Sequence, residues 1–281
     1  MTAIENVSAG AVADVAATQA RCGLAPSIQW TLTRVLPGLT FCVLLIAAWQ
    51  LMSVRMASPL VPDVAEIGRE IARIVDNGMA AKQIGVTLWR IVVGFSLAFA
   101  IACSLGIVAA RSVIFRAFLE PAIVLGLTVP GLVWALLCVI WFGVSLWTAI
   151  VSIALGTSPA LILSIIQGVQ SVDAQVVEMA HVFRLPRSAK LRYIWLPSLV
   201  PYLFSGARLG FSLAWKVIVL VELFGLSNGV GYQLNSEFSS QNVAGVIAWT
   251  IVFWIVMSVI EYGLLQSLER RSKRWQRTAR V

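Results

Sequence analysis

The segment Val177–Pro201, VEMAHVFRLPRSAKLRYIWLPSLVP, is a polar and basic island in a sequence that is otherwise almost continuously apolar. It carries four cations, Arg184, Arg187, Lys190 and Arg192. Each charge at the centre of a bilayer costs about 2.5–3.5 kcal/mol on the insertion scale, so the segment lies in water between two membrane spans. Pro186 interrupts it, and the residue before a proline is biased away from helical geometry. We therefore expect two short helices here.

The composition indicates an all-α polytopic membrane protein. Of the 281 residues, 59% are hydrophobic and only 12% are charged, whereas soluble domains usually contain about 25% charged residues. The cysteines have no CxxC or metal-binding spacing, so we predict neither a disulfide framework nor a metal site; they are Cys22, Cys42, Cys103 and Cys138.

We expect six transmembrane helices, because one crossing needs about 20 apolar residues. No Asp, Glu, Lys or Arg occurs from Pro121 to Val172, a run that fits two crossings. The expected spans are residues 35–54, 84–110, 122–142, 146–168, 198–224 and 243–265. The expected domains are a mobile cytoplasmic extension (1–34), a transmembrane domain (35–268) with a loop at 172–197, and a basic cytoplasmic tail (269–281).

A polar stretch separates the first two expected spans. Asp63 and Glu66 have the spacing of a capping box. Apolar residues then follow a helical period, namely Val64, Ile67, Ile71, Ile74 and Val75. This pattern predicts an amphipathic helix, lying either on the membrane surface or on the outer face of the protein itself.

The distribution of Lys and Arg predicts the orientation, because cytoplasmic loops carry an excess of them. Fourteen of the 21 Lys and Arg residues fall in the two termini, the break at residues 111–120 and the basic segment. With six spans, these four regions all lie on the same side of the membrane. This places both termini and the basic segment in the cytoplasm. The membrane topology then explains the net charge of +8, and nucleic-acid binding is not needed to explain it.

No catalytic motif is visible. HExxH and the phosphate-binding GxxxxGK[ST] are both missing from the sequence. We therefore expect no enzyme activity, no catalytic residue and no cofactor bound by this chain.

Charged residues inside membrane spans are the other functional candidates, because they are expensive there and usually face a bundle interior or a cavity. Glu222 would line the translocation pathway or make structural hydrogen bonds, and Arg90 would attract anions or extend towards the interface. Pro130 and Lys216 complete the candidate pathway residues. His181, in the basic segment, is expected at an interface or in solvent.

The basic segment resembles the EAA loop of ABC importer permeases, whose pattern is E-A-A, a later glycine, and I-x-L-P. Here the loop reads Glu178-Met179-Ala180 and Ile194-Trp195-Leu196-Pro197. Flanking motifs resemble the nitrate, sulfonate and taurine branch of type I importers, and the likeness covers about residues 40–268. They are Thr87-Leu88-Trp89-Arg90 with Gly94, Glu120-Pro121, Pro130, Trp141-Phe142-Gly143, Gly168-Val169, and Glu222 with Gly229-Val230-Gly231.

Two positions depart from the family pattern. Met179 replaces the second alanine, which a short helix tolerates. Arg184 stands where the family has glycine. If that glycine is a left-handed C-cap, a side chain there costs about 1 kcal/mol, so the geometry of this turn stays open while the docking role does not depend on it.

The resemblance implies a six-span permease of the type I fold in the inner membrane of a bacterium. Two copies, presumed identical, would form the pore for a small solute such as nitrate, a sulfonate or taurine. A soluble or lipid-anchored binding protein would deliver the solute, and a separate ATPase would bind ATP and Mg²⁺. The expected ATPase-coupling residues are Glu178, Ala180, His181, Arg184, Leu185, Arg187 and Pro197.

Two other classes of function stay open from the residues alone. An ATP-independent secondary transporter or channel would need no ATPase, although such carriers often show repeated halves and no internal repeat is visible. A membrane scaffold or enzyme subunit would use the same loop to recruit a different partner.

Overall fold

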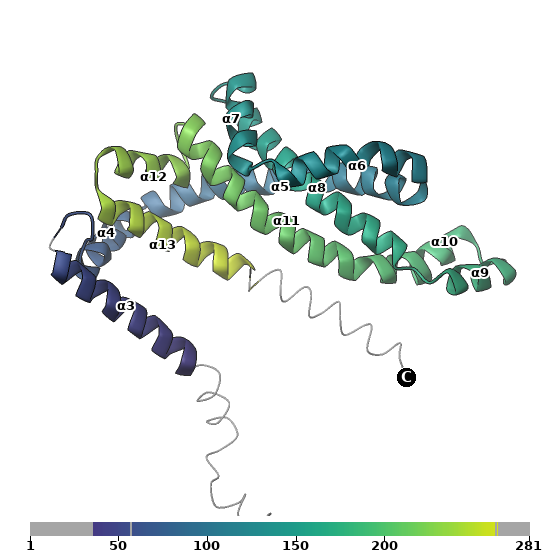
Figure 1. The fold of residues 1–281 in the computed structure, drawn as a ribbon, viewed down its shortest axis with the longest axis horizontal. Coiled ribbons are helices and arrows are strands. Elements are labelled where there is room, and N and C mark those ends of the chain that lie inside the picture. Colours follow the sequence, from purple (N-terminus) through teal and green to yellow (C-terminus); the bar gives the residue numbers. More distant parts are fainter. Residues whose placement is uncertain (1–35, 57, 262, 264–281) are drawn as a thin grey trace, which may run out of the picture. The chain divides into compact units, whose positions relative to one another are not determined.

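The computed structural model describes residues 36–56, 58–261 and 263, and every regular element in these ranges is a helix (Figure 1). In chain order they are α3 (Leu36–Met56), α4 (Val64–Asp76), α5 (Met79–Arg111), α6 (Val113–Thr128), α7 (Gly131–Phe142), α8 (Leu146–Gln170), α9 (Ala174–Val182), α10 (Arg187–Lys190), the π-helix η1 (Leu191–Trp195), α11 (Leu196–Gly225), α12 (Val230–Ser239) and α13 (Val243–Ile260). The expected extension at 1–34, the tail at 269–281 and Cys22 lie outside the described residues.

The chain divides into two units, Met1–Val64 and Ala65–Val281. In the first unit, α3 is apolar and exposed over most of its length, and its last turns hold the segment that follows. The Ser53 hydroxyl lies 2.7 Å from the Asp63 carboxylate, and the Trp49 indole N–H donates to the Pro62 carbonyl at 3.0 Å. Asp63 thus accepts from α3, although the sequence suggested that it caps the next helix.

Four helices are long and apolar enough to cross a membrane, and two bent helix pairs raise the number to six. The four are α3 from Pro37, α5, α8 and α13; the pairs are α6 with α7, and the run Arg187–Gly225 with α12. Helix α8 is the centre of the second unit, because 67% of its most apolar 18-residue stretch is buried inside the protein. The six-span, all-α prediction is confirmed at this level.

The third expected span, residues 122–142, is not one straight helix. It comprises the end of α6 and all of α7, which are bent by 100°. The bend falls at Val129 and Pro130, because proline has no N–H for a helix and Val129 before it is extended, with φ −70° and ψ 125°. Helix α6 also begins earlier than expected, since the Ser112 hydroxyl accepts the Phe115 N–H at 3.2 Å.

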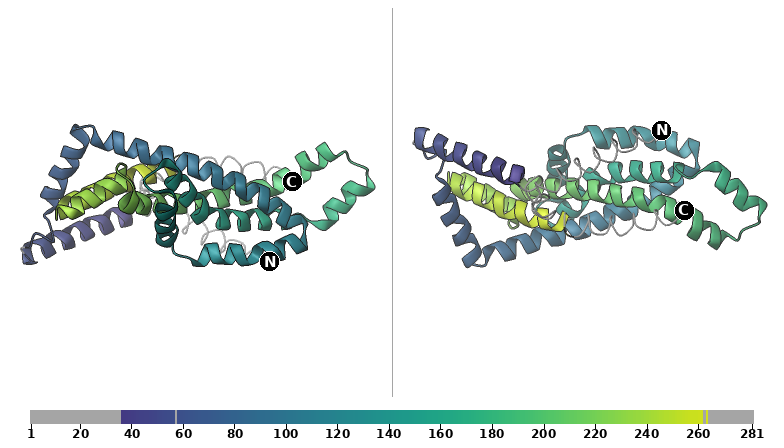
Figure 2. Two further views of the ribbon diagram at one scale, coloured as in Figure 1. Left: turned by 90° about the horizontal axis from the view of Figure 1, so that it is seen from above. Right: turned by 90° about the horizontal axis from the view of Figure 1, so that it is seen from below.

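Helices α5, α8 and α11 pack closely through small residues (Figures 1 and 2). A Cβ added at Gly94 of α5 would meet Ile153 of α8 at 2.8 Å, and one at Gly206 of α11 would meet Ser164 at 2.7 Å. Close approach through glycine is typical of membrane helices, where dispersion contacts replace the hydrophobic effect as the driving force. The packing of α5, α8 and α11 in the core of the second unit therefore requires that the backbones of these helices approach closely.

The amphipathic pattern of α4 is compatible with a place on the membrane surface or on the outer face of the protein. In the structure α4 packs on the protein. Ile67 and Ile74 are buried, and Ile74 belongs to the main core cluster. The Arg73 guanidinium lies 3.1 Å from the Glu237 carboxylate of α12. Gly78, with φ 67°, follows the helix in the left-handed conformation.

Candidate functional site

The basic segment forms a hairpin of two short helices, α9 and α10, before the chain enters α11 through η1. This hairpin projects beyond the long helices of the second unit (Figure 2). Helix α9 begins where the Asp173 carboxylate accepts the Gln175 N–H at 2.9 Å. Helix α10 begins after Pro186, whose missing N–H costs nothing at a helix start. The two expected helices are present.

A Schellman turn ends α9, with Arg184 in the left-handed position at φ 49°. The Leu185 N–H donates to the Ala180 carbonyl at 3.1 Å, and the Arg184 N–H donates to the His181 carbonyl at 3.0 Å. These are the two hydrogen bonds that define the motif. The turn therefore has the form that a glycine would allow, although the residue is arginine. Arg184 adopts the strained conformation because both bonds and the following proline hold the chain in place.

Arg184→Gly is expected to stabilise the turn by about 1 kcal/mol, because glycine has no Cβ penalty at positive φ. Amide hydrogen exchange at Leu185 should slow by about fivefold, the equivalent of that free energy. Arg187→Gly is the matched control: it removes the same charge, but from within α10, and should leave this exchange unchanged or faster. Equal slowing in both variants would attribute the effect to charge rather than to backbone strain.

The predicted coupling residues lie on this hairpin, except for Pro197 in the first turn of α11, and they are not equally accessible. Glu178, His181, Arg184, Leu185, Arg187 and Pro197 are exposed. Ala180 is 0% exposed, so its side chain is covered by this chain itself. The Lys190 ammonium lies 3.4 Å from the His181 ring nitrogen Nδ1.

Large apolar side chains also face outwards on the hairpin. Val182 and Phe183 at the end of α9 are more than two-thirds exposed, as is Tyr193 of η1. They stand among Arg184, Arg187, Lys190 and Arg192. An exposed apolar patch rimmed by charge is typical of a protein-binding surface, and sequence reasoning had noted only its charged part.

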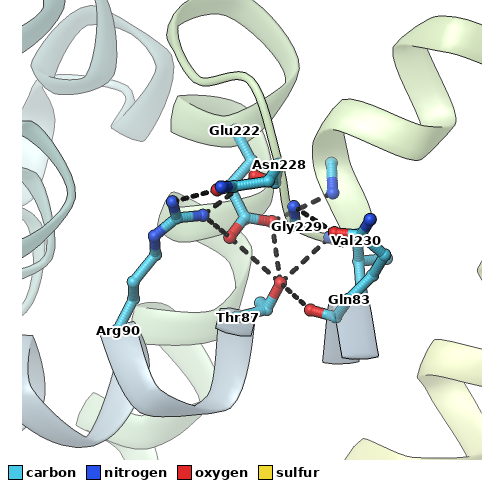
Figure 3. Close-up of polar contacts among 8 residues, drawn as sticks. Gln83, Thr87, Arg90, Glu222, Asn228, Gly229 and Val230 are labelled. Atoms are coloured by element: carbon cyan, nitrogen blue, oxygen red, sulfur yellow. Dashed lines mark hydrogen bonds and ion pairs between the residues drawn. The ribbon is translucent and has the colours of Figure 1, made fainter. Parts of the chain in front are cut away.

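The second cluster is buried and joins helices far apart in the sequence (Figure 3). The Glu222 carboxylate of α11 is 0% exposed. It lies 2.7 Å from an Arg90 guanidinium nitrogen and 2.9 Å from the Thr87 hydroxyl, both from α5. Arg90 also donates to the backbone carbonyl of Asn228 at 2.9 Å and to its side-chain oxygen. Neither charge is left uncompensated, as burial requires.

Three successive backbone N–H groups at the start of α12 also bond to this buried cluster. We call the whole arrangement the buried knot. Gly229 donates to the Gln83 side-chain oxygen at 2.8 Å, Val230 to the Thr87 hydroxyl at 3.0 Å, and Gly231 to Glu222 at 3.0 Å. These amides have no partner within their own helix. Side chains of α5 and α11 therefore cap α12 and fix it to both helices.

Two glycines make the close approach possible. Gly229 has φ 105°, which strongly favours glycine, and a Cβ there would overlap the Glu222 carboxylate. A Cβ at Gly231 would overlap the Val219 carbonyl. The segment between α11 and α12 can therefore pass close around the Glu222 carboxylate.

The structure brings together only two of the four candidate pathway residues. Arg90 and Glu222 form the buried pair. Pro130 is exposed at the bend before α7, and Lys216 is exposed on α11, with its ammonium 5.8 Å from the centre of the Trp215 ring. Sequence reasoning missed Gln83, Thr87 and Asn228. Gln83, Thr87 and Arg90 do recur at helical spacing on one face of α5, which is a usable signal.

Comparison with known proteins agrees with this architecture. Residues 102–274 match the family model described as binding-protein-dependent transport system inner membrane component. The chain is 27% identical to the putative aliphatic sulfonates transport permease protein SsuC of Bacillus subtilis (85% of this chain, 87% of that protein). It is 28% identical to the taurine transport system permease protein TauC of Escherichia coli (88% and 92%) and 27% identical to the nitrate import permease protein NrtB of Synechocystis (83% and 88%).

Solved structures show the same fold. An inward-facing form of the MetNI methionine ABC transporter has a TM-score of 0.60 at 14% identity, covering 68% of this chain and 95% of that one. An amino acid ABC transporter crystallised with histidines has a TM-score of 0.58 at 19% identity, covering 71% and 97%. The secondary transporter or channel is not supported by these comparisons. The chain belongs to the inner-membrane permeases of binding-protein-dependent ABC importers.

Proposed function

We propose that this permease carries a small oxyanion of the sulfonate, taurine or nitrate type, and that a separate ATPase drives it through the α9–α10 hairpin. The exposed apolar and cationic surface of that hairpin is the observation that carries the proposal. A surface of this kind suits a groove on a partner, with the apolar side chains buried and the cations at the rim setting the register. Glu178 would pair at the same rim.

Helix α11 is the element that would transmit the motion. From Arg187 to Gly225 the chain runs through α10, η1 and α11 as one helical segment. Movement of the hairpin would therefore displace α11 directly. At its other end α11 is bound to α5 and α12 by the buried knot, so the displacement would extend to those helices.

The relatives' names motivate the solute class. Aliphatic sulfonates, taurine and nitrate all carry an anionic group of oxygens on a small molecule. We infer a solute of that class for this chain. Two copies of the chain would enclose the pathway, and a binding protein would deliver the solute on the side opposite the hairpin. This orientation, with the hairpin and both termini in the cytoplasm, follows from the distribution of Lys and Arg.

This chain would contribute no catalysis and would bind no ATP. Among the described residues no group of three or more His, Cys, Asp or Glu could hold a metal ion. ATP and Mg²⁺ would be bound by the ATPase, and the chemical step would be hydrolysis on that subunit.

Reconstitution tests the proposal. The permease, co-expressed with its neighbouring ATPase, is placed in liposomes with the binding protein outside and ATP inside. We expect uptake of radiolabelled taurine, an alkanesulfonate or nitrate that requires ATP and is blocked by orthovanadate. Uptake that ignores both ATP and orthovanadate would overturn the ATP-driven mechanism, and uptake of none of the three anions would overturn the solute class.

A further inference from the structure

Helix α11 carries a line of polar and cationic side chains that the buried knot does not use. Ser205, Arg208, Ser212 and Lys216 follow one another at intervals of three, four and four residues. At 3.6 residues per turn they fall within about 80° of one face. We call these four residues the cationic stripe.

The stripe lies on the side of α11 that faces away from α8. The buried positions of this helix form the opposite face, and they include Gly206, Gly210, Ala214, Val217 and Val221. Gly206 and Gly210 approach α8 so closely that an added Cβ would meet its side chains at 2.7–2.9 Å. This packing fixes the rotation of α11 about its own axis. The stripe therefore lies opposite the face that packs on α8.

The stripe cannot face lipid without a large cost. Arg208 lies about 18 Å from the beginning of α11 and about 25 Å from its end, counting 1.5 Å per residue. It is 36% exposed, and Lys216 is exposed as well. A charge at such a depth costs about 2.5–3.5 kcal/mol on the insertion scale, so exposed charges inside a span face a water-filled cavity or another polar surface.

The electrostatics of the stripe suit an anion. The Glu261 carboxylate lies 3.3 Å from Arg208 and offsets part of its charge. Lys216 has a ring contact with Trp215 but no carboxylate within 4 Å among the described residues. Arg90, the other arginine of a span, is fully engaged by Glu222 and Asn228. Lys216, not Arg90, is therefore the cation of the spans that offers positive charge to a solute.

We propose that the cationic stripe lines the passage of the anionic solute, with Lys216 and Arg208 as successive contact points and the two serines donating hydrogen bonds between them. From Ser205 to Lys216 the stripe extends about 16 Å, roughly half of the hydrocarbon thickness. The ligand class is a small oxyanion, sulfonate or nitrate. The inference deepens the proposed function and rests on it for the direction and energy source of transport.

Charged thiol reagents test the stripe without requiring that the solute be known. Ser212→Cys is introduced into the full chain after its four native cysteines are replaced by alanine, and the permease is assembled with its ATPase. The probes are MTSES, which carries a sulfonate, and MTSET, which carries a quaternary ammonium. Relative to the rate of each reagent with a small free thiol, we expect MTSES to react about tenfold faster than MTSET at this position, because the flanking cations concentrate anions.

Two further variants decide what causes the difference. Adding Lys216→Gln to Ser212→Cys should reduce the MTSES preference several-fold, while Lys216→Arg should retain it. Val92→Cys, at an exposed apolar position of α5, is the control and should react with neither reagent. No reaction at Ser212→Cys would overturn the passage, and a preference for MTSET, or one that ignores residue 216, would overturn its anion selectivity.

The failure of this inference and that of the proposed function are distinguishable. If orthovanadate-sensitive uptake is intact but Ser212→Cys is inert to both reagents, the stripe is sealed and only the inference fails. If Ser212→Cys prefers MTSES but ATP drives no uptake, the stripe stands as an anion passage and the ATP-driven mechanism fails.

Discussion

Arg90→Met is expected to lower the unfolding temperature of the purified chain by about 10 °C, because it leaves the Glu222 carboxylate charged and buried without its partner. Removing one member of a buried ion pair costs about 3–5 kcal/mol, and 1 kcal/mol corresponds to about 2–4 °C in a chain of this size class. The measurement is thermal unfolding in detergent, followed by size-exclusion chromatography.

The matched control is Arg73→Met. Arg73 also pairs with carboxylates, those of Glu70 and Glu237, but its side chain is 52% exposed. An exposed pair contributes about 0–1 kcal/mol, so its loss should shift unfolding by at most a few degrees. Equal effects of the two variants would show that burial does not make the Arg90 pair special.

A double variant separates the pair from its surroundings. If Arg90 and Glu222 depend on each other, then Arg90→Met combined with Glu222→Leu costs less than the sum of the two single variants. Some cost must remain, because Gly231 and Asn228 would still lose partners. Strict additivity would contradict the coupling between the two charges.

Glu178→Lys is expected to reduce ATP-dependent transport to less than about a tenth while leaving the amount of protein in the membrane unchanged. Glu178 is exposed on α9, so its replacement disturbs no core packing. Reversing a charge at a docking surface places like charges together, which costs several kcal/mol of association. The measurements are orthovanadate-sensitive uptake and co-purification of the ATPase.

Glu66→Lys provides the same charge change on α4, where the side chain is also exposed. It should leave ATPase association intact. Full transport by Glu178→Lys would refute the coupling role of Glu178, and loss of transport with normal ATPase binding would place its effect after docking.

Much of the fold was readable from the sequence, because membrane helices are long and apolar and polar loops separate them. The α9–α10 hairpin was expected from its charge and from Pro186, and both helices are there. The bend between α6 and α7 was not expected, since a proline within an apolar run is compatible with a span that continues or with one that turns. Only the neighbouring helices decide between these outcomes.

The pairing of charges in the buried knot could not be predicted from the sequence. Arg90 and Glu222 were each singled out as expensive charges inside spans, yet their pairing was missed. They are 132 positions apart, and no local period relates residues on two different helices. The turn at Arg184 shows a second limit. A local rule gave the cost of a side chain at a left-handed position but left the geometry of the turn open, and in the structure two hydrogen bonds and Pro186 hold the turn in its usual form.

Labelling of the hairpin tests the central claim most directly. Val182→Cys, exposed at the end of α9, is introduced into the cysteine-free chain and treated with a membrane-impermeant maleimide. The account predicts labelling in inverted membrane vesicles, none in intact spheroplasts, and protection in the vesicles when the ATPase is bound. Labelling from the outer face, or equal labelling with and without the ATPase, would contradict it.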